Sequence, residues 1–438
     1  MRGLILTLIV VGSIPWMLYR PFVGLMFWVG LGYLNPHRLT FGFARDLPFV
    51  QVAAIATLIA FFFSTEPKRV PWKAVTVVWL LFTLWTCFTT LFALNPTDAG
   101  TEWARFIKIQ VMTLMMLIML TSRRRIEIAV WVIVGSIAFY GTKGGIFTLL
   151  SGGQYYVLGP PGTFISGSNE IAFAMIVVLP LLWYLWQTSK LRWVKWTLVA
   201  AAALCVVSIM GSQSRGAFLA LVAMLGMLWL KSSGKLVTGT LAVLAVVVGL
   251  LFMPEEWMER MRNIPNYEQD LSALGRLNAW GFALNLAAAN PIMGGGFRAF
   301  TPENFLLYAP EPENFHDAHS IFFEVLAEQG YVGLLLFVLL GLLTFVMAAR
   351  TIRACRGRDD LVWAARLSAM VQVGLVGYLV GGLFLGLAYF DLPYSLMAIV
   401  VATHVVALRE LRTATGPVDA VVLQSGPQAA ANGLTVQQ

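Results

Sequence analysis

The stretch NFHDAHSIFFEVLAEQGYVGLLLF, residues Asn314–Phe337, joins a polar segment with two histidines to a long apolar run. The apolar run continues to about residue 349, close to the ~20 residues that a helix needs to cross a bilayer. The chain has 4 histidines in 438 residues, and two of them stand at the edge of this run. The stretch therefore predicts a membrane helix with a polar site at its water-facing edge.

Apolar runs of this kind recur along the whole chain. Hydrophobic residues make up 58% of it and charged residues only 12%, whereas soluble domains carry roughly a quarter charged residues. So little charge cannot cover a soluble surface, and we predict an all-α polytopic membrane protein. The net charge of +8 does not indicate a nucleic-acid partner, because Lys and Arg cluster in short loops between the apolar runs.

The loop charges predict the topology. The apolar runs lie at 3–19, 22–34, 47–63, 74–94, 103–120, 126–150, 171–188, 194–211, 216–230, 235–253, 330–349, 366–388 and 392–408. After residue 64 every second loop is basic, which by the positive-inside rule makes those loops cytoplasmic. The loops predicted to be periplasmic are 35–46, 95–102, 151–170, 212–215, 254–329 and 389–391.

We expect about 12 transmembrane helices with the C-terminus inside. Residues 3–34 are ambiguous, because they form either two crossings with the N-terminus outside or one crossing broken at Arg20–Pro21. The predicted organisation is an N-terminal transmembrane bundle, a large periplasmic loop with surface helices, C-terminal transmembrane helices and a cytoplasmic disordered tail, over residues 1–253, 254–329, 330–408 and 409–438 respectively.

The long loop contains a segment with helical periodicity. Apolar or small residues recur at helical spacing, and Asn290–Pro291 ends the run; they are Leu274, Leu277, Gly281, Leu284 and Ala288. We predict a helix lying along the membrane surface, with Arg276 off the apolar stripe.

His319 is the first candidate catalytic residue. Asp317 is a suitable N-cap and Gly330 a suitable stop, which would place His319 in the first helical turn. The positive end of the helix dipole favours a neutral imidazole, the form that a general base needs. Two simpler interpretations remain, an interfacial histidine bonded to backbone or a zinc pair with His316. HxxH without nearby cysteines is weak support for zinc.

Arginines at the predicted periplasmic face are candidates for binding an anion. Arg215 lies in the short loop MGSQSRGAF between two spans, where a fixed guanidinium suits a phosphate oxygen. Arg276 lies on the surface helix, and Arg298 follows the glycine run MGGGF, whose glycines would let backbone approach a ligand. Ordinary interfacial or loop arginines are the alternative interpretation.

Further polar residues share this face. Asn169 and Glu170 stand at the head of a span, where Asn169 also suits a helix cap, and Arg38, Arg45 and Arg105 are expected nearby. Together with His316 and Arg298 we predict that they bind substrate. A basin rich in Arg and His suits a pyrophosphate.

Three segments resemble one known family. They are SQSRGAF, GRLNAW followed by NPIMGGGF, and HSIFFEVLAEQGYVGLLLF after the long loop. Their order is similar to that in the O-antigen ligase and polymerase superfamily of bacterial inner-membrane proteins. The family's usual His-Asn pair is His-Ser here, at His319 and Ser320, a variant that resembles the subgroup of O-glycosylation ligases associated with exosortase systems.

The resemblance implies a multi-pass protein of the bacterial inner membrane with its active site facing the periplasm. It implies transfer of a glycan from undecaprenyl pyrophosphate to an acceptor hydroxyl, with a lipid A–core sugar of lipopolysaccharide as the expected acceptor. Membrane lipids would be further partners, and no metal, cofactor or nucleotide sugar is expected. The family's essential histidine corresponds to His319, and its phosphate-handling arginines correspond to Arg215 and Arg276.

These implications give a mechanistic hypothesis and several alternatives. The arginines would stabilise the departing pyrophosphate while His319 takes the acceptor proton, in one displacement that inverts the anomeric carbon. The same chemistry would serve a protein O-oligosaccharyltransferase or an O-antigen polymerase. A transporter of lipid-linked glycan is an alternative of a different class, although we find no convincing internal repeat. A scaffold or channel remains a further alternative.

Overall fold

The chain is an all-α protein in a computed structural model that describes residues 1–232, 234–251 and 271–414. It is 77% helical, and the described residues form 15 helices and no strand. Eight of these helices are long and apolar enough to cross a membrane, and three more are apolar but shorter. The prediction of an all-α polytopic membrane protein is confirmed, while the number of crossings, about 12, stays a prediction.

Each predicted apolar run is a helix. The helices are α1 (Arg2–Tyr19), α2 (Pro21–Leu34), α3 (Phe49–Phe63), α4 (Ala74–Leu91), α5 (Pro96–Met119), α6 (Arg123–Leu150), α7 (Ser168–Thr188), α8 (Arg192–Gly211), α9 (Arg215–Lys231), α10 (Lys235–Leu251), α12 (Leu271–Ala289), α13 (Pro302–Tyr308), α14 (Ile321–Ala354), α15 (Val362–Gly381) and α16 (Asp391–Ala414). Short 3₁₀ helices lie at η1 (Pro36–Leu39), η2 (Phe43–Arg45) and η4 (Asp359–Leu361).

The first two helices form an antiparallel pair, so the interpretation of residues 3–34 as one broken crossing is wrong. The chain reverses at Arg20, whose extended backbone precedes Pro21 at the first position of α2. The start of α1 then lies beside the loop that follows α2, because a Cβ added to Gly3 would lie 2.8 Å from Cβ of Ala44. The beginning of α1 and the loop 35–46 therefore lie at the same end of the molecule.

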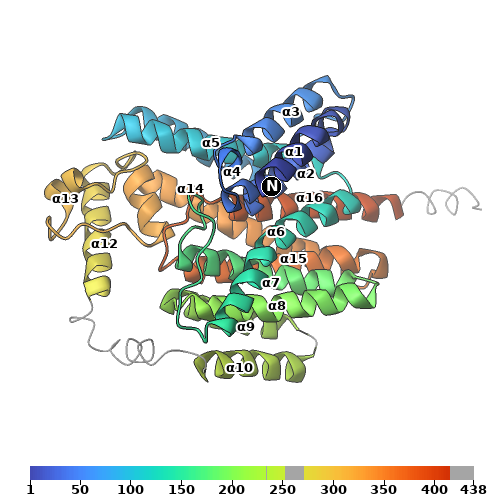
Figure 1. Ribbon diagram of the computed structural model, residues 1–438. Helices are drawn as coiled ribbons and strands as arrows, with labels where there is room; N and C mark the ends of the chain where they lie inside the picture. The colour runs from blue at the N-terminus through green and yellow to red at the C-terminus, as the bar shows by residue number, and fades with distance from the viewer. Residues whose placement is uncertain (233, 252–270, 415–438) are drawn as a thin grey trace, which may run out of the picture.

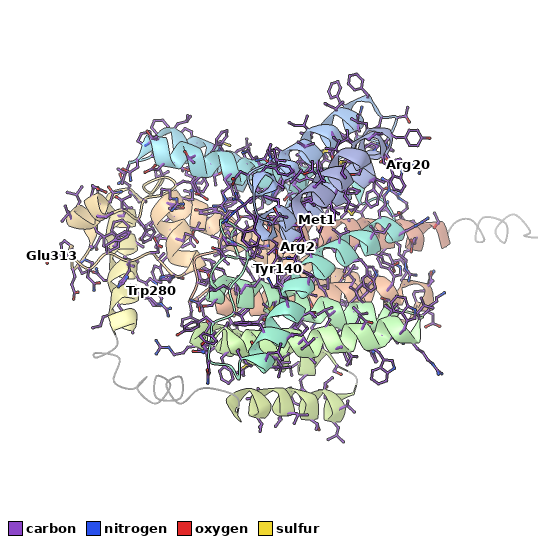
Figure 2. The ribbon with its side chains drawn as sticks, in the orientation of Figure 1. Met1, Arg2, Arg20, Tyr140, Trp280 and Glu313 are labelled. Carbon is purple, nitrogen blue, oxygen red and sulfur yellow. The ribbon has the colours of Figure 1, made fainter. Side chains whose placement is uncertain are left out.

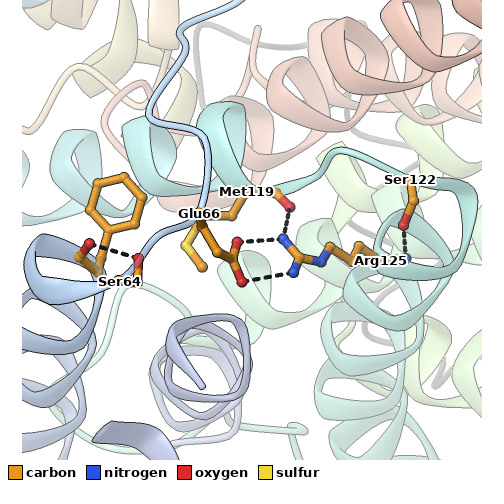
Figure 3. Close-up of polar contacts among 6 residues, drawn as sticks. Ser64, Glu66, Met119, Ser122 and Arg125 are labelled. Carbon is orange, nitrogen blue, oxygen red and sulfur yellow. Dashed lines mark hydrogen bonds and ion pairs between the residues drawn. The ribbon is translucent and has the colours of Figure 1, made fainter. Parts of the chain in front are cut away.

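Three of the predicted basic loops meet at one end, which we call the basic end. The Arg125 guanidinium there donates to both carboxylate oxygens of Glu66 at 2.7 and 2.8 Å and also to the Met119 carbonyl (Figure 3). The Arg123 guanidinium lies 5.4 Å from the Trp363 ring, which brings the start of α15 to the same place. These three loops thus lie at one end of the helices, as the loop charges predict.

Small residues let the central helices pack closely. On α6, Gly141, Gly144 and Gly145 face α8, and a Cβ on Gly145 would lie 2.2 Å from the Leu204 carbonyl oxygen. Close backbone contact of this kind replaces the hydrophobic driving force that is missing between helices in lipid.

The long loop forms a separate cluster at the other end, called here the site end. In Figure 1, α12 and α13 stand at the left, and α12 runs across the direction of the long bundle helices. The buried face of α12 is formed by Ala279, Phe282, Ala283 and Leu286, which pack with Phe305 of α13.

The apolar stripe predicted for this helix is wrong in part. Leu277 is 47% exposed and Leu284 is 48% exposed. The periodicity was correct for a helix, but α12 buries smaller and aromatic residues instead. The exposed leucines are consistent with the predicted surface location.

The end of the chain differs from its prediction. Residues 409–414 belong to α16 rather than to a disordered tail. The predicted tail over 415–438 lies outside the described residues, as does the charged opening of the long loop, 254–270.

Candidate functional site

The HSIFFEVLAEQG segment begins and ends its helix differently from the sequence prediction. Ser320, not Asp317, is the N-cap of α14, so His319 precedes the helix instead of lying in its first turn. His319 has a left-handed backbone with φ 42°. Gly330 breaks the helix with φ 68° and ψ −173°, which confirms it as a stop, although a second helical segment follows directly.

The loop before His319 is fastened to α12. The Asn278 amide donates to the Glu311 and Asn314 carbonyls at 2.8 Å and accepts from the Glu311 amide at 2.8 Å. The Trp280 indole donates to the Ala318 carbonyl at 2.9 Å. Figure 2 labels Trp280 on α12. These bonds fix the residue next to His319, which is what a positioned catalytic group requires.

His316 packs directly on α12. A Cβ added to Gly275 would lie 1.7 Å from His316 Cδ2, so this position requires glycine. The contact places His316 against α12 at Gly275, the residue before Arg276. His316 thus contributes to holding the loop against α12.

The glycine run has a role different from the predicted one. The Gly295 and Gly296 amides donate to the Ala327 and Glu328 carbonyls at 2.8 Å. Gly294 has φ 66°, and a Cβ there would lie 2.6 Å from the Ala327 oxygen. These glycines allow the backbone to approach the break in α14, not a ligand.

A cavity of about 390 Å³ lies beside His319. It is lined by Glu102, Arg105, Thr163, Phe164, Ser166, Glu170, Arg298, Phe300, Asp317, Ala318, His319, Glu324, Glu328, Leu385, Gly386, Leu387 and Tyr389. Distant segments of the chain therefore meet here, from α5, the loop 151–167, the loop after the glycine run, α14 and the loop before α16. We call it the carboxylate cavity, because five of its lining side chains are Asp or Glu.

The charges of this cavity contradict the expected basic basin. Arg298 forms an ion pair with Glu102 at 3.1 Å, and its backbone amide donates to Glu328 at 2.8 Å. Arg105 lies 3.7 Å from Glu102 and covers the Phe164 ring at 3.8 Å. Both arginines are thus engaged by protein groups within a lining that carries more carboxylates than guanidiniums.

The surroundings of His319 favour a neutral imidazole. Burial and the nearby Arg276 charge lower the pKa of His319, with Asp317 opposing and His316 adding to the effect. Desolvation disfavours the charged ring, and a neighbouring cation does the same. The neutral form expected from the sequence is therefore favoured, for a reason other than a place in the first helical turn.

The two predicted catalytic arginines lie outside the lining of the carboxylate cavity. Arg276 is on α12 and acts electrostatically on His319. Arg215 is the first residue of α9, after the N-cap Ser214. The next residue, Gly216, packs on the loop before α16, because a Cβ there would lie 3.0 Å from Phe384 Cβ. Arg215 is thus one residue away from a contact with the loop that provides Leu385.

The remaining predicted residues divide between the cavity and its surroundings. Glu170 lines the cavity, and its carboxylate folds back over Gly167. Asn169 lies in the first turn of α7 while Gly167 is the N-cap, so Asn169 does not cap the helix. Arg38 lies beside Gly162 and 3.7 Å from Asp46. Arg45 is exposed in η2 and is not among the lining residues.

Left-handed backbone concentrates at this end of the molecule. Among the described residues, the non-glycine residues with positive φ are Asn35, Gln213, Arg298 and His319. Arg298 and His319 line the cavity, and Gln213 lies in the Arg215 loop. Such conformations cost of order 1–3 kcal/mol each and cluster at functional sites.

Sequence reasoning missed the two carboxylates of α14, Glu324 and Glu328. Glu324 accepts a hydrogen bond from the Ala388 amide at 3.1 Å, and Glu328 is 6% exposed. Both stand one turn apart in an otherwise apolar segment, and acidic residues there are costly enough to suggest function. That spacing was visible in the sequence, whereas the partnership of Glu102 with Arg298 was not.

Metal binding by the two histidines gains no support from the geometry. In the ranges that the structure describes, no three His, Cys, Asp or Glu side chains come together as a metal site. His316 is directed onto Gly275, as described above.

Two family models match parts of the chain. Residues 1–190 match a family of unknown function, DUF5935. Residues 200–338 match the family described as O-Antigen ligase. The matched range contains Arg215, Arg276 and His319. No curated protein matches the chain. The match agrees with a glycosyltransferase-type enzyme of the glycan ligase or polymerase kind, in a multi-pass membrane protein. This domain at residues 200–338 supports membership of the O-antigen ligase superfamily.

Proposed function

We propose that the protein transfers a glycan from undecaprenyl pyrophosphate to an acceptor hydroxyl at the periplasmic face of the bacterial inner membrane. The acceptor that we expect is a sugar of the lipid A–core. The observation that carries the proposal is His319, held in front of α14 with a lowered pKa and with Arg276 as a cationic neighbour. A neutral imidazole beside a fixed cation suits a base that acts next to an anionic leaving group.

An apolar groove supports a lipid-linked donor. It has a volume of about 510 Å³ and is lined by α6, α7, α8, α9 and α10. Along α8 its lining extends from Leu198 to Gly211. The Gly211 end adjoins the loop of Arg215, which the Gln213 amide ties to the Gly153 carbonyl at 2.9 Å.

A polyprenyl chain in this groove would bring its pyrophosphate to the arginine loop. Because the chain already lies in the bilayer, its affinity for the groove would come from close packing rather than from removal of apolar surface from water. The head group would then lie at the site end, where Arg215 can meet its phosphate oxygens with a planar fork.

The proposed reaction is a single displacement. The acceptor oxygen attacks the anomeric carbon and forms the new glycosidic bond as the bond to the pyrophosphate oxygen breaks. His319 takes the hydroxyl proton, and the electron pair leaves with the pyrophosphate. Arg215 and Arg276 stabilise the growing negative charge. One displacement inverts the configuration at the anomeric carbon.

The direct test uses purified protein in liposomes with a polyprenyl-pyrophosphate glycan and three acceptors. The acceptors are lipid A–core, a hydroxyl-bearing peptide and a second lipid-linked glycan. We expect mass analysis to find the glycan on lipid A–core, with inverted configuration, with or without EDTA and without energy input. Transport of the donor with no new bond would overturn the proposal, and a product on another acceptor would correct its acceptor.

A further inference from the structure

The carboxylate cavity offers a second binding site next to His319. We propose that it binds the acceptor, as a sugar that is uncharged or carries an amine, and that the donor pyrophosphate lies outside it on the side of Arg215 and Arg276. This inference rests on the proposed function. It adds the place and the charge class of the acceptor.

Charge argues against a pyrophosphate in the cavity. Five acidic side chains line it, whereas Arg298 and Arg105 both lie within ion-pair distance of Glu102. An anion would have to displace Glu102 from these arginines and approach the remaining carboxylates. An ionised carboxylate repels an anion in a partly desolvated site, and both guanidiniums of the lining already lie within ion-pair distance of Glu102, so the lining disfavours anionic groups.

The acidic groups are held as a built site. Glu324 is fixed by the Ala388 amide at 3.1 Å, and Gly386 of the same loop lines the cavity. Glu328 accepts the Arg298 amide through Oε1. Its carboxyl group also interacts with the Tyr389 hydroxyl, another lining residue. Both glutamates are therefore held in place by protein groups at the wall of the cavity.

Sugar hydroxyls match these groups. An ionised carboxylate accepts hydrogen bonds, and a protonated one both donates and accepts, so either form binds a hydroxyl. Phe164, Phe300 and Tyr389 add aromatic surface to the lining.

The position of His319 completes the argument. His319 lines the cavity. The neighbouring charge that lowers the pKa of His319 belongs to Arg276 on α12, which is not part of the lining. A hydroxyl bound in the cavity would therefore meet the imidazole from one side. The leaving group would be stabilised from the other side. This arrangement suits attack on the anomeric carbon opposite to the departing oxygen.

The kinetic experiment compares Glu324→Gln and Asp317→Asn with the control Glu313→Gln. Glu313 is exposed on the same loop cluster and is not a lining residue (Figure 2). We expect the first two variants to raise the KM for acceptor roughly tenfold or more, as for loss of a charged hydrogen bond. The KM for donor should stay within about twofold. The control should change neither constant.

Asp317→Asn keeps the test valid if Glu324→Gln fails to fold. Glu324 is buried, whereas Asp317 is exposed on a loop. If wild-type protein transfers glycan while both variants keep the acceptor KM of the wild type, the cavity is not the acceptor site. A rise in the donor KM instead would also overturn the inference. The proposed ligase function would stand in both cases.

A binding experiment without donor separates the two proposals. The probes are a glucosamine trisaccharide, its N-acetylated form and a galacturonic acid trisaccharide, measured by thermophoresis in detergent. We expect the first two to bind and the acidic one not to bind, with Glu324→Gln weakening the first. Binding with this selectivity by a protein that never transfers glycan would retain the site and reject the ligase. Equal binding of the acidic probe would reject the site.

Discussion

His319 and Arg276 form the electrostatic pair on which the proposed chemistry depends. The imidazole has its pKa lowered first by burial and then by Arg276. Since a general base works only when neutral, transfer should be constant at neutral pH. It should fall by roughly tenfold per pH unit below the pKa of His319, which lies under its usual 6.5.

Removing the Arg276 charge should shift the pH at which transfer begins to fall, which we call the acidic limb of the pH profile. In Arg276→Gln the cation that disfavours imidazolium is gone, so the pKa of His319 rises and the limb shifts to higher pH. Arg276→Lys keeps the charge and should leave the limb in place, even where it lowers the maximal rate. The measurement is kcat/KM for transfer from pH 5 to 8. An unchanged limb in Arg276→Gln would show that another group is the base.

Trp280 tests how the histidine loop is held. Its indole donates to the Ala318 carbonyl at 2.9 Å, and its ring stacks on Phe323 at 4.8 Å. Trp280→Phe keeps an aromatic ring but loses the bond, which should cost about 1 kcal/mol of stability. We expect a lower thermal transition in detergent and a lower kcat with similar donor KM. An unchanged kcat would mean that this bond does not position His319.

The role of a site residue could be predicted from the sequence only where its residue type allows few kinds of chemistry. The planar hydrogen-bonding fork of an arginine or the titration of a histidine near neutral pH can be expected from the sequence. The cap of α14 was misassigned because Asp317 and Ser320 are both good N-cap residues three positions apart. The pairing of Glu102 with Arg298 joins residues from α5 and from the loop after α12, and no local pattern indicates it.

At the scale of elements, the break in α14 connects the site to the membrane bundle. Gly330 has φ 68°, and a Cβ there would lie 2.3 Å from the Ile292 carbonyl oxygen. The Tyr331 amide donates to the Pro291 carbonyl at 2.9 Å beside it. The break therefore anchors the segment that leads into the glycine run and Arg298.

Gly330→Ala should be strongly destabilising. It adds a clash with backbone to a left-handed conformation, with a cost of about 1–3 kcal/mol or more. Gly341→Ala is the matched control on the same helix, because its Cβ would meet no atom within 4 Å. We expect the control to melt at or above the wild-type temperature. Equal melting of both variants would contradict the described packing around Gly330.

The helices themselves were the most predictable feature, because a bilayer requires long apolar runs with internal hydrogen bonds. Each predicted run coincides with a helix over the described residues, although some ends differ clearly, as at α14, which begins at Ile321 rather than at residue 330. The face that α12 buries was not predictable from leucine spacing. Its partners are Phe305 of α13 and Ala327 of α14, which lie far along the chain.

At the scale of the whole molecule, the loop charges and the arrangement of the helices distinguish the same two ends, the basic end and the site end. The hairpin of α1 and α2 places Arg2 and Arg20 at opposite ends of α1, as Figure 2 also shows. The positive-inside rule then predicts that Arg2 and Glu313 face the periplasm and that Arg20 and Arg358 face the cytoplasm.

Cysteine labelling tests this topology. The three native cysteines, Cys87, Cys205 and Cys355, would first be replaced by alanine. In intact cells with a permeable outer membrane, Arg2→Cys and Glu313→Cys should react with a membrane-impermeant maleimide. Arg20→Cys and Arg358→Cys should react only after the inner membrane is opened. Labelling of Arg358→Cys from outside would reverse the orientation and place the site in the cytoplasm.

The central claim is that His319 takes the acceptor proton in glycan transfer, and the most direct measurement is the transfer rate of His319→Ala in liposomes at neutral pH. Glu313→Gln serves as the matched variant on the same loop cluster. The account predicts that His319→Ala inserts and melts like the wild type but transfers at least ~10²-fold more slowly, while Glu313→Gln transfers normally. A His319→Ala protein that transfers glycan at nearly the wild-type rate would contradict it.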